Sequence, residues 1–229
     1  MTPLVLIPGM MCDSRLYAPQ LAALNRRPVM VAPCTEAVTV EALAALVLAA
    51  APPRFALAGL SMGGIVAMEV VRQAPERVER LCLMDTNPKA ESEAIRAARV
   101  PQIDRALSGG LEAVMRDEMK PNYLAKSGSR SEILDLCMKM ALDLGPEVFA
   151  RQSRALAARP DQQATLVAYS GPTLILCGAE DRLCPLHRHE LMHRLMPGSH
   201  LAVIAGAGHL PTLERPGETT GAILRWLAA

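Results

Sequence analysis

The chain has 229 residues, of which 51% are hydrophobic, 21% charged and 3% aromatic. This length holds one full α/β domain and is too short for two ordinary domains joined by a linker. The 24 basic and 23 acidic residues leave a net charge of +1, so charge and aromatic content exclude nucleic acid and an anionic membrane as expected partners.

The N-terminal region shows no targeting signal. The first residues carry no basic region and the apolar run Leu4–Ile7 is short, so no signal peptide is expected. The alanine-rich stretch Ala42–Ala51 is far shorter than the roughly 20 residues of a membrane span. The six cysteines are scattered without a CxxC pair, which favours a reducing compartment. We therefore expect a cytoplasmic protein.

Short apolar runs alternate with longer segments of helical periodicity, which is typical of βαβ units and a mostly parallel sheet. The runs are apolar on both faces, as strands covered by helices on both sides usually are. The expected strands are Leu4–Ile7, Val29–Ala32, Phe55–Ala58, Leu81–Met84, Thr173–Cys177 and Ala202–Ile204. The expected helices are Val40–Ala50, Met62–Gln73, Leu186–Met196 and Glu218–Ala228.

The segment from Pro88 to Ala168 has no strand-like run and predicts a helical insertion. Its expected helices are Glu91–Leu107, Leu111–Met119, Glu132–Leu144 and Glu147–Ala158, and the breaks between them are Ser108-Gly109-Gly110, Pro121-Asn122, Ser127-Gly128-Ser129 and Gly145-Pro146. We therefore expect an α/β core formed by residues 1–87 and 169–229, with a helical cap formed by residues 88–168.

The segment Gly59–Gly63 matches the G-x-S-x-G pattern of a nucleophile elbow. The pattern alone is weak, but here an apolar strand leads into it and a helical segment follows. The sharp turn needs little bulk, which Gly59, Gly63 and Gly64 provide. The turn would expose Ser61 Oγ as a nucleophile. The alternative is a serine that only caps the following helix.

A serine nucleophile needs a neighbouring base, and His209 is the best candidate. It lies in the glycine-flanked loop Ala205–Pro211 after the last expected strand, and such loops often carry function. His189 and His193 are one helical turn apart and could chelate a metal ion. No cysteine or acid pair completes that set, so no metal ion and no other cofactor is expected.

Two aspartates could orient the histidine. Asp181 lies in the loop Cys177–Pro185 just past an expected strand, and Asp85 ends another strand. Both follow the serine and precede the histidine in the chain, as this architecture requires. The flanking glycine and proline favour Asp181, whereas Asp85 could simply cap the turn Thr86–Pro88. Glu180 is a weaker candidate.

Acyl transfer also needs donors for the oxyanion. The first expected donor is the backbone N–H of Met62, directly after the nucleophile. The second is the N–H of Met10, in the loop after the first strand, where Gly9 allows close approach of the substrate. An ordinary Pro-Gly turn is the alternative for this loop.

These motifs resemble the α/β-hydrolase superfamily, in particular the small capped esterases that include the pimeloyl-carrier-protein methyl ester esterases. The matching segments are Ile7–Met10, Gly59–Gly64, Ala74–Val78, Gly178–Pro185 and Gly206–His209 with Glu214–Pro216. The resemblance covers nearly the whole chain in order. It implies a mostly parallel sheet with helices on both faces, and a helical cap inserted before the strand that leads to the acid loop. Pro8 stands where these proteins usually carry a histidine.

The residues and the resemblance together predict a cofactor-independent serine hydrolase of a small to medium carboxylic ester or thioester. The alternatives are a lyase or carbon–carbon hydrolase that uses the same residues, and a non-catalytic ligand-binding protein. Between Pro88 and Thr165, 12 basic residues face 11 acidic ones, so no strong anion trap is expected. The methionines of the cap favour an apolar acyl group.

Overall fold

The computed structural model describes residues 1–126 and 130–229, with six parallel strands in one sheet. The strands are β1 (Leu4–Ile7), β2 (Val29–Val31), β3 (Phe55–Leu60), β4 (Val78–Met84), β5 (Thr173–Gly178) and β6 (His200–Ile204). Their order is β2-β1-β3-β4-β5-β6, and every neighbouring pair is parallel. Every residue of β1, β3 and β5 is buried. The predicted α/β class is confirmed.

Strand β4 begins before the predicted Leu81–Met84. The apolar pattern missed this start because the first residues of the strand include polar ones. Glu79 accepts a hydrogen bond from the Thr2 hydroxyl, and Arg80 donates to the Trp226 carbonyl oxygen. These polar partners let the strand begin at Val78 without an apolar run.

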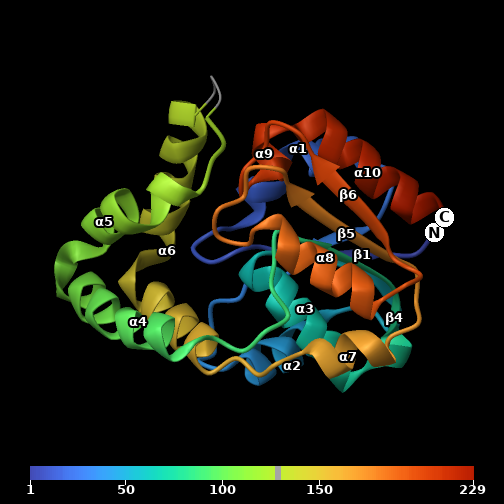
Figure 1. The fold of residues 1–229 in the computed structure, drawn as a ribbon, viewed down its shortest axis with the longest axis horizontal. Coiled ribbons are helices and arrows are strands. Elements are labelled where there is room, and N and C mark those ends of the chain that lie inside the picture. Colours follow the sequence, from blue (N-terminus) through green and yellow to red (C-terminus); the bar gives the residue numbers. More distant parts are fainter. Residues whose placement is uncertain (127–129) are drawn as a thin grey trace.

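Helices cover both faces of the sheet (Figure 1). One face carries α2 (Val40–Ala50), α3 (Met62–Gln73), α7 (Gln163–Ala168) and α8 (Leu186–Leu195). The other face carries α1 (Ala18–Ala23), α9 (Pro211–Glu214) and α10 (Pro216–Ala228). The inner strands β1, β3 and β5 are therefore buried on both faces, as the two-sided apolar runs predict, whereas the edge strands β2 and β6 are partly exposed.

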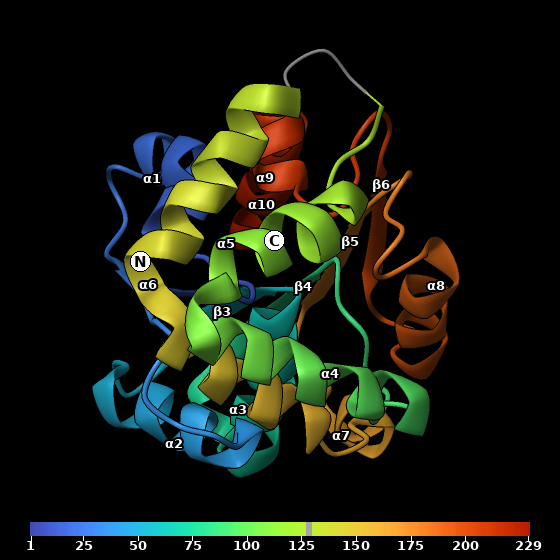
Figure 2. The same cartoon turned by 90° about the vertical axis from the view of Figure 1, so that its left-hand side faces the viewer.

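Three helices between β4 and β5 stand apart from these layers: α4 (Glu93–Arg105), α5 (Leu111–Val114) and α6 (Arg130–Ala157). They lie beyond one end of the sheet, opposite both termini (Figure 1), and stand in front of it in the second view (Figure 2). Helix α7, at the end of the same insertion, contacts α3 and α8. The division into residues 88–168 and the remainder stays a prediction.

Helix α6 contains the two predicted helices joined at a break. Gly145 has a φ of 82° inside it, and Pro146 follows. A proline cannot donate the helical hydrogen bond, and glycine tolerates a positive φ, so the chain turns here and resumes its helix. The predicted break at Ser127-Gly128-Ser129 lies outside the described residues. No helix within the described ranges has the length and apolarity that crossing a membrane requires.

Candidate active site

Ser61 occupies a strained turn between β3 and α3. Its φ of 56° and ψ of −117° are rare for a residue with a side chain. A Cβ atom at Gly59 would overlap the Gly63 carbonyl group, and one at Gly63 would overlap the Ile7 carbonyl oxygen. The Thr86 hydroxyl donates to the Ser61 carbonyl oxygen at 2.7 Å. The glycines therefore let three backbone segments meet, and the surrounding contacts hold the serine in place.

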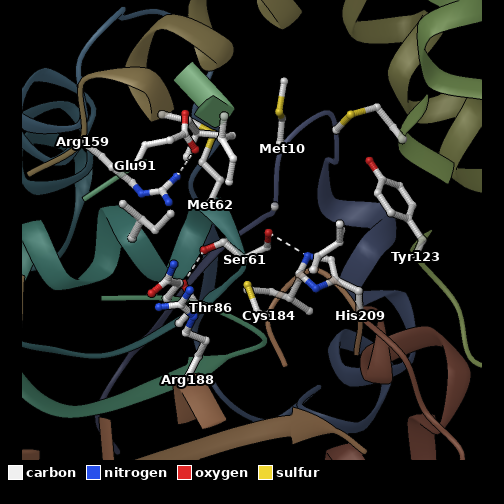
Figure 3. Close-up of a pocket in the computed structure, with 18 of the residues that line it drawn as sticks. Met10, Ser61, Met62, Thr86, Glu91, Tyr123, Arg159, Cys184, Arg188 and His209 are labelled. Carbon is white, nitrogen blue, oxygen red and sulfur yellow. Dashed lines mark hydrogen bonds and ion pairs between the residues drawn. The ribbon is translucent and has the colours of Figure 1, made fainter. Parts of the chain in front are cut away.

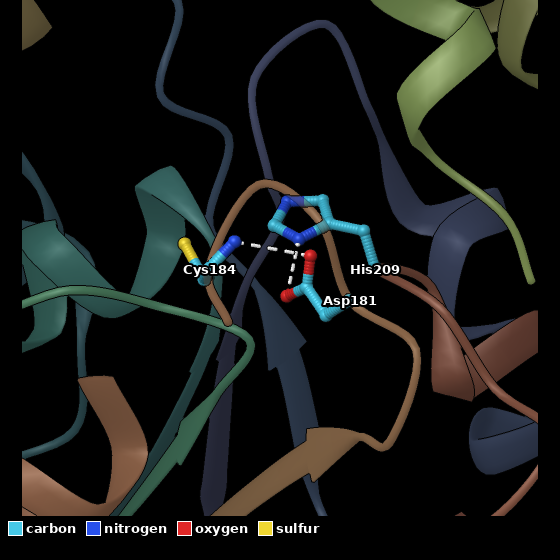
Figure 4. Close-up of side chains that lie close together, drawn as sticks. All are labelled: Asp181, Cys184 and His209. Atoms are coloured by element: carbon cyan, nitrogen blue, oxygen red, sulfur yellow. Dashed lines mark hydrogen bonds and ion pairs between the residues drawn. The ribbon is translucent and has the colours of Figure 1, made fainter. Parts of the chain in front are cut away.

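His209 and Asp181 come together with Ser61 although they lie on three separate loops. Nε2 of His209 is 2.8 Å from Ser61 Oγ, and Nδ1 is 2.8 Å from Asp181 Oδ2 (Figure 4 shows the histidine and the aspartate). Both are ordinary hydrogen-bond lengths. The backbone N–H of His209 donates to the Tyr123 carbonyl oxygen at 2.7 Å, so the segment before α6 helps to fix the histidine loop.

The Asp181 carboxylate has further hydrogen-bond donors on its second oxygen. Oδ1 accepts the backbone N–H groups of Leu183 at 2.8 Å and Cys184 at 3.0 Å. Burial acts to raise the pKa of Asp181, but the charge and hydrogen bond of His209 and these two N–H donors outweigh it and lower the pKa. An ionised Asp181 favours the proton on Nδ1 of His209, which leaves Nε2 free to accept from Ser61.

Asp85, the alternative acid, has a different partner. Its Oδ1 accepts the Gly178 backbone N–H at 2.8 Å, and within residues 1–126 and 130–229 its Oδ2 has no hydrogen-bond partner. Burial first, and then the neighbouring Asp181 charge, hold the pKa of Asp85 well above its usual range. The structure therefore brings Asp181 to the histidine and leaves Asp85 as a buried carboxyl behind it.

The histidine pair considered for metal binding has separate partners. His189 is buried, and its Nε2 accepts the Thr86 backbone N–H at 3.1 Å. Burial lowers the pKa of His189 to about 4. Nδ1 of His193 is 2.8 Å from the Ser199 hydroxyl. The two imidazoles therefore serve two different contacts.

Cys184 lies beside Asp181 and His209, although no pattern in the sequence indicated this position. Its sulfur, an Asp181 oxygen and a His209 nitrogen lie within 4.8 Å of one another (Figure 4). Burial raises the pKa of the Cys184 thiol well above its usual range, which keeps it protonated. The aspartate and the histidine are already bonded to each other, so this set is not arranged as a free metal site.

The two expected oxyanion donors, Met10 and Met62, line the same pocket as Ser61 (Figure 3). Within the described chain, neither backbone N–H has a hydrogen-bond acceptor. Met62 is the first residue of α3, where N–H groups lack intrahelical partners. Both donors are therefore available to a ligand at the serine.

Gln152 of α6 holds the loop that carries Met10. Its Oε1 accepts the Met11 N–H at 2.8 Å, and its Nε2 donates to the Cys34 carbonyl oxygen at 2.8 Å. Met11 has a φ of 55°, so this loop is strained and needs such support. The sequence signal was an amide side chain among the mostly apolar residues of this helix face.

A cavity of about 320 Å³ lies over Ser61 and is lined by both the core and the cap. Met10 and Tyr123 lie on one side of the serine, and Glu91 and Arg159 lie on the other (Figure 3). The charged lining residues are Glu91, Arg99, Arg159 and Arg188. The balanced composition of the whole cap predicted no anion trap. The lining of the cavity itself has more basic than acidic residues, because the composition also counts exposed side chains that do not reach it.

A parallel sheet with a serine at the strand-to-helix turn and helices inserted over that turn defines an α/β hydrolase. The family model described as "Alpha/beta hydrolase family" matches residues 4–222. The chain therefore belongs to the α/β-hydrolase family, and the predicted fold and hydrolase class are confirmed.

Two curated relatives and one solved structure show which proteins are similar. A protein provisionally named carbamate hydrolase RutD, from Yersinia enterocolitica, is 27% identical over 97% of this chain and 86% of its own. The pimeloyl-[acyl-carrier protein] methyl ester esterase of Photobacterium profundum is 28% identical over 79% of this chain and 73% of its own. A thermophilic esterase from Thermogutta terrifontis is 31% identical, with a TM-score of 0.89, and the match covers 100% of this chain and 90% of that one.

Proposed function

We propose that the protein is a serine hydrolase that cleaves a small to medium carboxylic ester or thioester. The observation that carries this proposal is the continuous hydrogen-bonded series from Ser61 through His209 to Asp181, with 2.8 Å at each step. The esterases among the similar proteins support ester chemistry. The reaction would use these three side chains and no cofactor.

In the first half of the reaction, Ser61 Oγ attacks the carbonyl carbon while Nε2 of His209 accepts its proton. The tetrahedral oxyanion receives hydrogen bonds from the Met10 and Met62 N–H groups. His209 then gives the proton to the leaving alcohol or thiol, and the acyl group stays on Ser61. Asp181 holds the imidazole in position and stabilises its positive charge.

In the second half, water attacks the acyl-enzyme and His209 accepts the water proton. The carboxylic acid leaves, and Ser61 recovers its proton. Residues 88–168 would act as a cap that closes the pocket over this chemistry. Met10, Met62 and Met119 line the pocket, and their flexible apolar side chains suit an apolar acyl chain.

The compartment proposed for this reaction is the cytoplasm. All six cysteines are free and five of them are buried. Free thiols persist most readily in a reducing compartment.

Labelling with a fluorophosphonate, together with turnover of p-nitrophenyl acetate, tests the proposal. We expect stoichiometric labelling at Ser61 and steady ester turnover, and Ser61→Ala and His209→Ala should each lower turnover to near background. Circular dichroism and thermal melting would verify that each variant is folded. Wild-type turnover in Ser61→Ala would contradict the proposal.

Substrate panels separate the remaining alternatives. A folded chain that binds ligands but labels slowly and turns nothing over is a binding protein. Preferential cleavage of diketones over esters and thioesters would indicate a carbon–carbon hydrolase on the same residues.

A further inference from the structure

One wall of the cavity carries more positive than negative charge. Three arginines line it, namely Arg99, Arg159 and Arg188, whereas Glu91 is the single acidic residue among the described lining residues. Arg99 donates to both oxygens of Glu91, and Arg159 Nη1 donates to Oε1 at 2.6 Å. A single carboxylate therefore serves two guanidinium groups, and the third guanidinium has no acidic partner in the pocket.

The glutamate and two of these arginines lie largely out of solvent, and Arg188 is half-buried. The side chains of Glu91, Arg99 and Arg159 are 2%, 13% and 9% exposed. Burial lowers the pKa of Arg159, and the Arg99 charge acts in the same direction, while Glu91 offsets them only in part. A buried charge is costly unless it is fully paired, so an anion at this wall would relieve the imbalance.

Donor groups remain available at the wall. Arg159 uses Nε for the Lys89 carbonyl oxygen and Nη1 for Glu91, and its Nη2 has no acceptor in residues 1–126 and 130–229. The guanidinium of Arg188 likewise makes no hydrogen bond or ion pair to any described residue. The fork of an arginine matches the two oxygens of a carboxylate.

The wall is close to the reacting serine. The positive charges of Arg159 and Arg188 both act to lower the pKa of Cys184, which lies against Asp181 and His209. Figure 3 shows Arg159 on the far side of Met62 from the histidine, with Arg188 below the serine. A chain that starts at Ser61 and passes Met62 would therefore run toward Arg159, and Arg188 lines the same cavity.

We propose that Arg159 and Arg188, with Arg99 and Glu91 behind them, form a carboxylate-binding subsite for an ester whose acyl chain ends in a carboxylate. This inference rests on the proposed function, because the same Ser61 attacks the ester at the other end of the chain. It refines the apolar acyl group: the methylenes lie against Met62 and the charged end pairs with the arginines. The ester alkyl group would lie on the side of Met10 and Tyr123.

The test compares matched esters that differ only in this charge. Monomethyl succinate, glutarate and adipate would be compared with the methyl esters that carry a terminal carboxamide in place of the carboxylate. For the best chain length we expect kcat/KM to be at least about tenfold higher for the carboxylate, since hydrogen bonds to charged groups are the stronger ones. Chromatography of the released acid measures kcat/KM for the carboxylate ester and for the carboxamide ester.

Three variants test whether the preference for the carboxylate ester depends on the arginines that line the cavity. Arg159→Gln should bring the ratio of carboxylate to carboxamide close to one, and Arg188→Gln should lower it several-fold. Arg188 makes no side-chain bond to the described protein, so its variant should fold even where Arg159→Gln does not. Arg154→Gln is the control, because Arg154 is exposed near the end of α6, shortly before Arg159 in the chain, and does not line the cavity; it should keep the wild-type ratio.

A wild-type ratio near one, or a ratio that neither variant changes, would overturn the subsite while ester hydrolysis by Ser61 stands. If no ester is hydrolysed, the proposed function fails and calorimetry on Ser61→Ala decides the subsite. Saturable binding of glutarate, weakened at least about tenfold by Arg188→Gln, would support it. Equal binding of glutarate and glutaramide, or none of either, would overturn it.

Discussion

Asp181 and Asp85 follow neighbouring strands, and burial acts on both carboxyl groups. Asp181 gains a histidine and two backbone donors, which lower its pKa. Asp85 gains one backbone donor and lies near the Asp181 charge, so its pKa is raised. The environment of Asp181 therefore favours the ionised carboxylate, which can stabilise a histidine cation, whereas the environment of Asp85 favours the neutral carboxyl.

Amide substitutions should separate these two aspartates. Asp181→Asn should lower kcat by up to about 10⁴-fold, because the amide favours the wrong histidine tautomer. Asp85→Asn should lower kcat/KM less than about tenfold, since its amide oxygen still accepts the Gly178 N–H and its NH₂ resembles a protonated carboxyl. Initial rates with one p-nitrophenyl ester measure both. The reverse ranking would assign the acid to Asp85.

His189 makes the folded protein sensitive to acid. Its folded pKa is about 4, against 6.5 for the ordinary group. As the pH falls below about 6.5, the unfolded chain binds a proton that the folded chain does not, so the free energy of unfolding decreases until about pH 4. The full effect is about 3 kcal/mol.

The comparison with His189→Gln isolates this effect, since the amide oxygen of glutamine could still accept the Thr86 N–H. Thermal melts of both proteins between pH 7 and pH 4 should show a smaller loss of stability in the variant. Parallel curves for the two proteins would mean that His189 titrates normally in the folded state.

Gln152, a buried amide of α6, connects the insertion between β4 and β5 with the loop that follows β1. Gln152→Leu should leave the Met11 N–H and the Cys34 carbonyl group unpaired, which costs about 1–3 kcal/mol for each. We also expect kcat to fall at least about tenfold, because the loop carries the Met10 oxyanion donor. Kinetics and chemical denaturation measure the two effects.

The neighbouring Ser153 is the matched control for Gln152. It is fully buried on the same helix, and within the described chain its hydroxyl has no hydrogen-bond partner. Ser153→Ala should therefore keep both activity and stability. If it were as harmful as Gln152→Leu, the losses would reflect packing of α6 rather than the two hydrogen bonds.

In the molecule as a whole, the cavity over Ser61 is lined both by loops of the sheet and by the helical insertion. The serine, the histidine and the aspartate all come from loops of the sheet, whereas Arg99, Arg159 and Tyr123 reach the cavity from the insertion. In open α/β sheets the ligand lies at the carboxyl ends of the strands. The proposed cap at that end would limit the size of the substrate.

A series of neutral p-nitrophenyl esters should reveal this limit. Each added methylene contributes up to about 0.8 kcal/mol, or roughly fourfold in kcat/KM, until the cavity of about 320 Å³ is full. We expect a rise across short acyl chains and a fall well before sixteen carbons. A flat profile, or one that still rises at sixteen carbons, would show that the cap does not close the pocket.

The local features of the fold follow from patterns along the chain. Apolar runs located all six strands. For β1, β3 and β5 the reason is that a strand buried on both faces can carry few polar groups. The Gly59–Gly64 turn located the serine, since only glycines let the backbone segments approach so closely. The order of serine, aspartate and histidine then limited the candidates to a few residues.

Features that depend on distances between remote segments could be determined only from the tertiary structure. Whether Asp181 or Asp85 meets His209 depends on how β4, β5 and β6 align. Both residues follow an apolar strand, so the sequence could favour Asp181 only through its flanking glycine and proline. The support of Met11 by Gln152 joins residues 141 positions apart. The positive wall arises because folding buries Arg159 beside Arg99 and Glu91 while the other cap charges stay in solvent, and a composition count cannot distinguish a buried charge from an exposed one.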